Sequence, residues 1–370
     1  MAAPTTDDRL NRALRLHDLS CEYEAAGDSA AAEAACREAL RLFEEIDGPV
    51  HPDVANLLHS LGALLERQGR YGEAEALAAR AVSIIDEVAG LVEGPEAELI
   101  LIQSLCLLGT ALRQQGRYRD AEPVLRRAIA RSEALGDRDA LAIALNDFGM
   151  VCKYSGKFAD GERAYRRALA IHLELFGEMH PAVATLYHNL GGLEHARGRY
   201  AAAEEPARRA WEIRRELLGP DHPDALADAC AYAGVLDGLE RFAESRPIYE
   251  HALGVWERLY GPQHFEVAAT LHNLAGVEAA EGRLDDAERL CRRALDIKCT
   301  LLGPGHPECA LTANNLGAVL RELGRHPEAE RQFRFAFAVF EATLEPDHPH
   351  VGLCRANLAE IGAAQAEKTD

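Results

Sequence analysis

Apolar residues in this chain recur at spacings of three and four in long segments, and most of these segments end at a glycine. In one of them, Val183, Tyr187, Leu190 and Leu193 follow this spacing. Such spacing places the apolar side chains on one face of an α-helix, which has 3.6 residues per turn. No run of alternating β-branched residues indicates a strand. The pattern therefore predicts an all-α protein.

The helical segments come in pairs with a fixed period. The linker "LLGPDHPD" at 217–224 stops one helix with Gly-Pro and allows the next to begin, because proline is tolerated in a first turn. Its histidine recurs every 42 residues, at His180, His222, His264, His306 and His348. A strict period of this length indicates a repeat architecture.

The repeat covers nearly the whole chain. Eight full units start near residues 9, 51, 98, 138, 180, 222, 264 and 306, and a half unit starts at 348. We expect one solenoid over 9–365. We also expect a disordered N-terminal tail at 1–8 and a short tail at 366–370.

A small residue stands in the middle of each first helix. These residues are Gly62, Gly109, Gly149, Gly191, Ala233, Ala275, Gly317 and Ala359. Glycine inside a helix costs up to about 1 kcal/mol in propensity. Its repeated use predicts that the second helix of each unit comes too close for a larger side chain. The expected counterparts in the second helix are Ala74, Ala121, Ala203, Ala287 and Ala329.

Three features recur besides the small residue: a "GRY" turn at 69–71, 116–118 and 198–200, the pair "AE" early in the second helix, and "RAL" further along it. Together they resemble the tetratricopeptide repeat. The 42-residue period and the "LG-x-x-HP" linker resemble the variety found in kinesin light chains and many bacterial proteins. The resemblance implies a right-handed superhelical solenoid of antiparallel helix hairpins with a C-terminal capping helix. It also implies that the first helices line a concave groove that binds peptides.

The resemblance places positions 6, 9, 10, 13, 16 and 17 of each unit in this groove. The polar candidates at positions 9 and 10 are Asn146, His188, Asn189, His272, Asn273, Asn314, Asn315 and Asn357. An asparagine amide both donates and accepts hydrogen bonds, so a ladder of them can hold an extended peptide backbone. Alternatively, these residues cap or bridge neighbouring helices. Cys230 and Ala231 interrupt the ladder, and small residues such as Gly276 at position 13 would let a peptide lie close.

The charge of the chain limits the class of partner. Sixty acidic residues against 40 basic ones give a formal charge of −20, which argues against nucleic acid and anionic membranes as partners. Tetratricopeptide domains that hold a C-terminal carboxylate carry Lys or Arg beside the Asn. Here Lys153 and Arg321 at position 16 are the basic candidates. We therefore expect a neutral or weakly polar peptide, or a basic one drawn by the overall charge.

Neither a cofactor nor a metal site is expected. The linker histidines should lie about 10 Å apart, too far to share one ion, and are interpreted as N-terminal caps of helices. Histidines in the groove (His59, His188 and His272) could weaken binding near pH 6. The nine cysteines show no ligand spacing and are interpreted as reduced thiols that fill the core or the groove.

The sequence thus predicts a non-enzymatic scaffold or adaptor that binds a peptide or a partner segment in its groove. No signal peptide opens the chain, so we expect a cytoplasmic protein, and the Ala-, Arg- and Gly-rich composition indicates a bacterial source. Two alternatives stay open: a peptide-sensing regulator, and a self-assembling scaffold that forms a homodimer through its terminal repeats. An enzyme with an unfamiliar site in the groove is the least favoured alternative.

Overall fold

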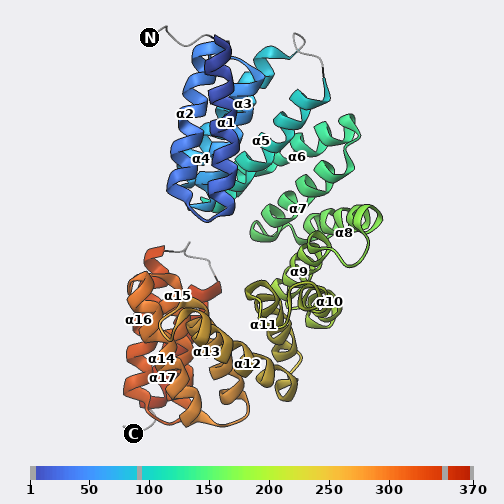
Figure 1. Cartoon of the computed structure of the whole chain (residues 1–370). Coiled ribbons are helices and arrows are strands. Elements are labelled where there is room, and N and C mark those ends of the chain that lie inside the picture. Colours follow the sequence, from blue (N-terminus) through green and yellow to red (C-terminus); the bar gives the residue numbers. More distant parts are fainter. Residues whose placement is uncertain (1–5, 90–93, 344–348, 367–370) are drawn as a thin grey trace. The chain divides into compact units, whose positions relative to one another are not determined.

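The computed structural model describes residues 6–89, 94–343 and 349–366, and every regular element within these ranges is an α-helix (Figure 1). The prediction of an all-α repeat protein is confirmed. The helices form two compact units, which divide between Arg197 and Gly198, and each unit is described by itself. A single solenoid over 9–365 stays a prediction. Its predicted tails lie mostly outside the described residues, although residues 6–8 already belong to the first helix.

The N-terminal unit consists of four helix hairpins and one further helix. Its helices are α1 (Thr6–Ala25), α2 (Ser29–Asp47), α3 (Pro52–Arg67), α4 (Tyr71–Val88), α5 (Pro95–Gln114), α6 (Tyr118–Leu135), α7 (Arg138–Tyr154), α8 (Phe158–Phe176) and α9 (Pro181–Ala196). Helix α5 is long and apolar enough to be a candidate membrane span by composition, but half of that stretch is buried in the unit. This burial is what a core helix among packed hairpins shows, and such a helix passes the same composition test.

The C-terminal unit begins with α10, the second helix of the repeat that starts at residue 180. It ends with α17, the first helix of the half repeat at 348. Its helices are α10 (Tyr200–Leu218), α11 (Pro223–Gly238), α12 (Phe242–Tyr260), α13 (Phe265–Ala280), α14 (Leu284–Leu302), α15 (Pro307–Glu322), α16 (His326–Thr343) and α17 (Pro349–Ala366). Neighbouring helices along the chain pack side by side, as Figure 1 shows for α13 to α16.

The linker histidines cap the first helices. In each case the imidazole Nδ1 accepts a hydrogen bond from the backbone N–H two residues later, at 3.2 or 3.3 Å. The capping residues are His51, His180, His222, His264 and His306. The predicted capping role is confirmed for these five, whereas His348 lies outside the described residues. Each cap satisfies one of the N–H groups that a helix start leaves without a partner.

A glycine with positive φ closes most of the first helices. Gly69 has a φ of +76°, and the following Arg70 N–H donates to the Leu65 carbonyl at 2.9 Å, which is the hydrogen bond of a Schellman cap. In the repeat of α11 the same place is taken by Glu240, with a φ of +59°. A residue with a Cβ is strained there by about 1–2 kcal/mol.

The small residues in the first helices allow the hairpins to close, as predicted. A Cβ atom on Gly317 of α15 would lie only 2.7 Å from the ring of Phe333 in α16. Phe333 is fully buried, so the ring has no room to move. The expected counterpart Ala329 is also buried, but the close contact comes from Phe333, one turn further along the second helix. The glycine thus accommodates a large side chain rather than another small one.

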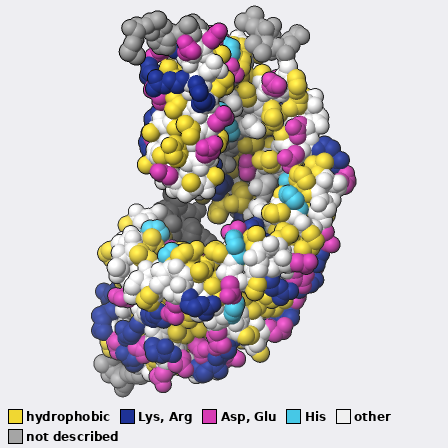
Figure 2. Space-filling model, viewed as in Figure 1, with side chains coloured by type: hydrophobic (Ala, Val, Ile, Leu, Met, Phe, Trp, Pro, Cys, Tyr) yellow, Lys and Arg dark blue, Asp and Glu magenta, His cyan; other side chains and the backbone are white. Residues whose placement is uncertain are grey.

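An arginine at the start of each of several second helices joins consecutive hairpins. The Arg325 guanidinium binds Glu328 of its own helix at 2.7 Å and Glu288 of the preceding second helix at 2.6 Å. Arg70, Arg117 and Arg241 are each paired in the same way. Figure 2 shows basic and acidic side chains interspersed on the visible face of the C-terminal unit. The recurring "GR" and "AE" thus hold one hairpin against the next.

Consecutive first helices also touch one another. Contacts join α3 to α5, α5 to α7 and α7 to α9 in one unit, and α11 to α13, α13 to α15 and α15 to α17 in the other. Within the described parts of each unit, consecutive second helices make no comparable contact. First helices therefore converge on one side of each stack. We call the exposed side of this layer the inner face of that unit.

Two glycines of the C-terminal unit should respond oppositely to the same substitution. Gly317→Ala should lower the free energy of unfolding by about 1–3 kcal/mol, because the added methyl group overpacks against Phe333. Gly276→Ala should raise it by about 0.5–1 kcal/mol, because a Cβ there meets no atom within 4 Å and alanine favours the helix. Urea unfolding followed by circular dichroism measures both. Equal effects of the two substitutions would contradict this account of the hairpin.

Candidate peptide-binding face

Polar side chains on the inner faces join consecutive first helices through hydrogen bonds. Asn189 Nδ2 donates to Asn146 Oδ1 at 2.8 Å between α9 and α7. Asn357 Nδ2 donates to Asn314 Oδ1 at 3.0 Å between α17 and α15. In both pairs the residue at position 9 of one repeat meets the residue at position 10 of the next, 43 residues later. We call these pairs the polar bridges.

Two more polar bridges have the same spacing of 43 residues. Asn315 Nδ2 lies 3.2 Å from His272 Nε2, and His17 Nε2 lies 3.4 Å from Ser60 Oγ. Six of the eight predicted groove residues, all except His188 and Asn273, therefore take part in a polar bridge to a neighbouring first helix. This is the arrangement expected from the alternative that the asparagines bridge helices. Because one amide can make several hydrogen bonds, a role of these residues in binding stays a prediction.

The predicted residues differ in how far they reach the surface. Asn189, Asn314 and Asn357 are buried, with 8–9% of their surface exposed. Asn146, His188, His272, Asn273 and Asn315 are half-buried.

Asn273 stands apart from the other asparagines. It is half-buried, and its amide forms no hydrogen bond with any residue that the structure describes. The residue that would bridge to it from the preceding repeat is Cys230, and a thiol is a weak hydrogen-bonding group. Gly276, one turn further along α13, is exposed, and a Cβ there would meet open space. Asn273 and Gly276 thus form an open patch with an available amide.

The inner face of the N-terminal unit contains an apolar pocket between α5 and α7. Its volume is about 180 Å³, and it is lined by Leu99, Ile102, Gln103, Cys106, Asp137, Asp139, Ala140 and Ile143. Ile143 leaves 46% of its surface exposed at this pocket. Both acidic residues at the pocket are engaged, because Asp137 caps α7 and Asp139 binds His172 at 3.0 Å. The pocket therefore suits an aliphatic side chain.

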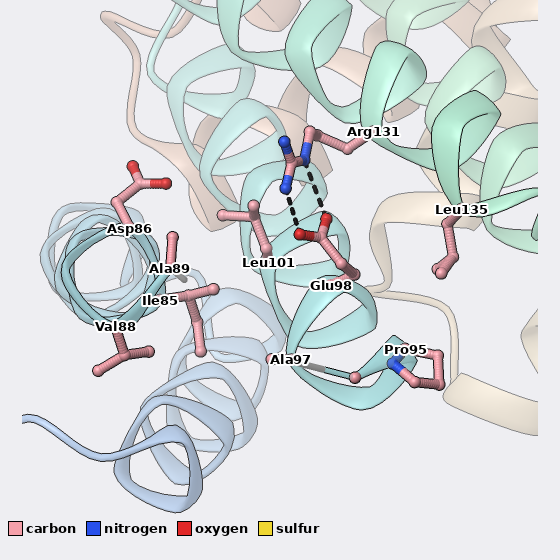
Figure 3. Close-up of a pocket in the computed structure, with 11 residues that line it drawn as sticks. Ile85, Asp86, Val88, Ala89, Pro95, Ala97, Glu98, Leu101, Arg131 and Leu135 are labelled. Atoms are coloured by element: carbon pink, nitrogen blue, oxygen red, sulfur yellow. Dashed lines mark hydrogen bonds and ion pairs between the residues drawn. The ribbon is translucent and has the colours of Figure 1, made fainter. Parts of the chain in front are cut away.

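A second pocket of the N-terminal unit lies among α4, α5 and α6 (Figure 3). It has a volume of about 480 Å³, with apolar side chains such as Ile85, Leu101 and Leu135 in its walls. The Arg131 guanidinium donates two hydrogen bonds to the Glu98 carboxylate across it. Because these charges neutralise each other, this pocket offers mainly apolar surface.

The sequence matches the tetratricopeptide repeat family over residues 7–87, 99–174, 141–216, 183–243, 228–300, 266–334 and 308–370. The chain belongs to this family. A comparison with curated proteins found no match.

Solved structures of tetratricopeptide repeat proteins share the fold. BtubC (BKLC) from P. vanneervenii is 24% identical, with 65% of this chain and 92% of that chain covered and a TM-score of 0.54. The apo form of the quorum sensor NprR from B. thuringiensis is 13% identical, with 89% and 87% covered and a TM-score of 0.68. NprR in complex with its cognate peptide NprX is 14% identical, with 88% and 84% covered and a TM-score of 0.54.

The sequence interpretation missed two basic groove residues, Arg67 and Arg113. Arg67 occupies position 17 of the unit that starts at residue 51 and pairs with Glu24. Arg113 occupies position 16 of the unit that starts at residue 98, the same position as Lys153 and Arg321. Counting from the altered linker of that unit would have revealed it. Neither Arg113 nor Lys153 forms an ion pair with a described residue, and burial lowers the pKa of Lys153. Arg321, in contrast, pairs with Glu360 of α17.

A chain of hydrogen bonds fixes the protonation state of His272. The Thr312 hydroxyl donates to the Glu308 carbonyl at 3.1 Å, and His272 Nδ1 lies 3.1 Å from that hydroxyl oxygen. With Nδ1–H donating to Thr312, Nε2 is left to accept from Asn315. Protonation of Nε2 would break this last bond.

His272 and His59 do not titrate where the sequence interpretation placed them. Burial, with a smaller effect of Lys298, lowers the pKa of His272 to about 4. Burial also lowers the pKa of His59 to about 4. The expected weakening of binding near pH 6 is therefore wrong for these two residues, since neither gains a proton in that range.

Metal donors come together at one place in the described ranges. Donor atoms of Asp47, His51 and Asp53 lie within 4.8 Å of one another at the start of α3. Both aspartates are exposed, and His51 Nδ1 already caps the helix. Exposed acidic side chains alone do not make a metal site, and none is assigned here.

The pKa of His272 predicts a loss of stability in acid. Its folded-state pKa of about 4 lies below the ordinary histidine value. The unfolded chain therefore binds a proton between these values that the folded chain does not bind, and stability falls as the pH drops through this window. His272→Gln should remove about 1–2 kcal/mol of the loss between pH 7 and pH 5. Thermal melts of both proteins across this range measure the difference. Parallel pH profiles of the melting temperature would contradict the assignment.

Proposed function

We propose that this tetratricopeptide repeat protein is a non-enzymatic scaffold that binds an extended peptide or partner segment on its inner faces. The fold is typical of interaction proteins without catalytic activity. The observation that carries the proposal is the gap in the polar bridges at Asn273, where an amide and the bare helix surface at Gly276 are open together. We place the protein in the cytoplasm as part of the same proposal.

The patch at Asn273 suits a peptide backbone. Its amide offers a donor and an acceptor to main-chain groups, and Gly276 adds no side chain that would keep a peptide away. Helical glycine without a packing role lowers stability by about 1 kcal/mol relative to alanine. Close approach of a ligand backbone would account for its presence on an exposed helix surface.

The inner face of the N-terminal unit supports binding by different chemistry. The pocket at Ile143 has room for one aliphatic side chain. Lys153 and Arg113 lie on the same layer of first helices without ion-pair partners among the described residues. In a chain of net charge −20, such cations favour a carboxylate on the ligand of this unit.

A peptide-sensing regulator is the alternative function. It is supported by the likeness in fold to the quorum sensor NprR and to NprR in complex with its peptide NprX. A sensor changes shape when its ligand binds. For this alternative we expect a bound peptide to reduce the radius of gyration in small-angle X-ray scattering. An unchanged radius at saturating peptide would leave the scaffold as the better description.

Peptide display tests the proposed function directly. A random peptide library selected on the full-length protein should yield binders, whose affinity is then measured for Asn273→Ala and Gly276→Leu. Loss of the amide should weaken binding about 5- to 30-fold, the equivalent of one or two hydrogen bonds. The leucine should weaken it more, because its side chain would occupy the ligand's place.

Gly254→Leu is the matched control for the steric variant. Gly254 lies in α12, a second helix of the same unit, and is half-buried. The control should bind the selected peptides like the wild type. Binders that tolerate all three substitutions would show that the patch at Asn273 is not the site. A library that yields no binder would contradict peptide binding itself.

A further inference from the structure

A carboxylate stands on α7 one turn beyond the apolar pocket between α5 and α7. Ile143 lines this pocket, and Asp147 follows it four residues later, so the two side chains lie on the same side of the helix, about 6 Å apart along its axis. Asp147 is half-buried and forms no ion pair with any residue that the structure describes. Its carboxylate accepts one long hydrogen bond, from Asn146 Nδ2 at 3.4 Å. The pocket thus has an unpaired carboxylate at one end.

Asp147 occupies the place where other repeats complete a polar bridge. It stands at position 10 of its unit, as Asn189 does in the next unit, where the amide reaches position 9 of the preceding repeat. For Asp147 the residue at that position 9 is Cys106 of α5, which is buried and itself lines the pocket. A thiol is a weak hydrogen-bond donor, so this bridge is not completed. The repeat therefore places the carboxylate beside the Cys106 end of the pocket.

An unpaired carboxylate in this position is energetically unfavourable. Burial raises the pKa of Asp147 to about 7, although Arg113 of α5 and the hydrogen bond from Asn146 oppose the effect and Glu66 of α3 adds to it. A cation bound beside the carboxylate would favour its ionised form. Later units carry asparagine at the same position, as at Asn189, so the repeat itself does not require a charge here. The site therefore suits a ligand with a positive charge next to an apolar group.

We propose that this site binds the free amino terminus of a peptide whose first residue is aliphatic, with the side chain in the pocket and the α-ammonium group on Asp147. The ammonium group and the side chain of a first residue are attached to the same carbon atom, which suits the short separation between the pocket and Asp147. A lysine next to an aliphatic residue fits less well, because neighbouring side chains of an extended peptide point to opposite faces. The proposal rests on the proposed function and specifies one end of the ligand.

Synthetic peptides with free and blocked amino termini test the proposal. A random hexapeptide library, attached to beads through the carboxyl ends, is screened with the full-length protein in two forms, one with free amines and one acetylated. The free-amine library should yield binders with leucine, isoleucine or valine in the first place. Acetylation of a selected binder should weaken its binding about 10- to 100-fold, because it removes a hydrogen bond between charged groups. Fluorescence polarisation of labelled peptides measures the affinities.

Asp147→Asn is the informative variant, because asparagine already occupies this position in other repeats, such as Asn189. The variant should bind the free-amine peptide as weakly as the wild type binds the acetylated one. It should bind the acetylated peptide like the wild type, since the two changes remove the same interaction and their effects do not add. Asp160→Asn is the matched control, because the Asp160 carboxylate pairs with Arg163 on α8. The control should keep the full preference for the free amine.

The two libraries separate a failure of this proposal from a failure of peptide binding. Binders that tolerate acetylation, or that lack an aliphatic first residue, would overturn the proposal and leave peptide binding intact. A preference for the free amine that persists in Asp147→Asn would do the same. If neither library yields a binder, both the proposal and the proposed function are wrong.

Discussion

The close approach of two helices within each hairpin determines where every other group of this protein lies. At Gly317 the Phe333 ring occupies the space that a side chain of α15 would otherwise fill, so the surface of α15 fits against α16 without a gap. Each first helix packs against its own second helix and against the preceding one, and its remaining surface meets the neighbouring first helices and solvent. The contacts between consecutive first helices, and the inner faces that they form, follow from this packing.

The polar bridges follow from the contacts between consecutive first helices. Once first helices touch, positions 9 and 10 of consecutive repeats meet, and polar side chains there must satisfy each other or lose hydrogen bonds to water. Asn146 with Asn189 and Asn314 with Asn357 do so. At Asn273 the opposite residue is Cys230, and the amide is left for another partner. The candidate site thus arises from one missing partner in an otherwise regular series.

The repeat and its helices could be predicted from the sequence because they depend on local signals. Gly and Pro at the linkers, a histidine before the first turn, and apolar spacing all act within a few residues. The tight hairpin was also predictable, although its large partner was not: the sequence suggested Ala329, whereas the ring of Phe333 makes the contact. Which side chain of a second helix reaches a given glycine depends on the rotation of that helix about its axis, and a spacing pattern does not specify this rotation to within one turn.

The candidate site was less predictable, for a related physical reason. The pattern placed the asparagines on the right face, but whether an amide points to a neighbouring helix or to solvent depends on a side chain 43 residues away. The depressed pKa of His272 likewise comes from burial by neighbouring repeats, with a smaller effect of Lys298. Arg113, in contrast, follows from counting its unit from residue 98, so the sequence did contain this signal.

Individual function in a repeat protein has to come from departures from the repeat. Positions that several units share, such as the capping histidines and the paired arginines, are occupied by stabilising contacts and have little capacity left for a ligand. Cys230 opposite Asn273 is such a departure, and it leaves an amide available. It changes the chemistry of one side chain at a position that the repeat keeps, so a site of this kind can be altered without loss of the fold.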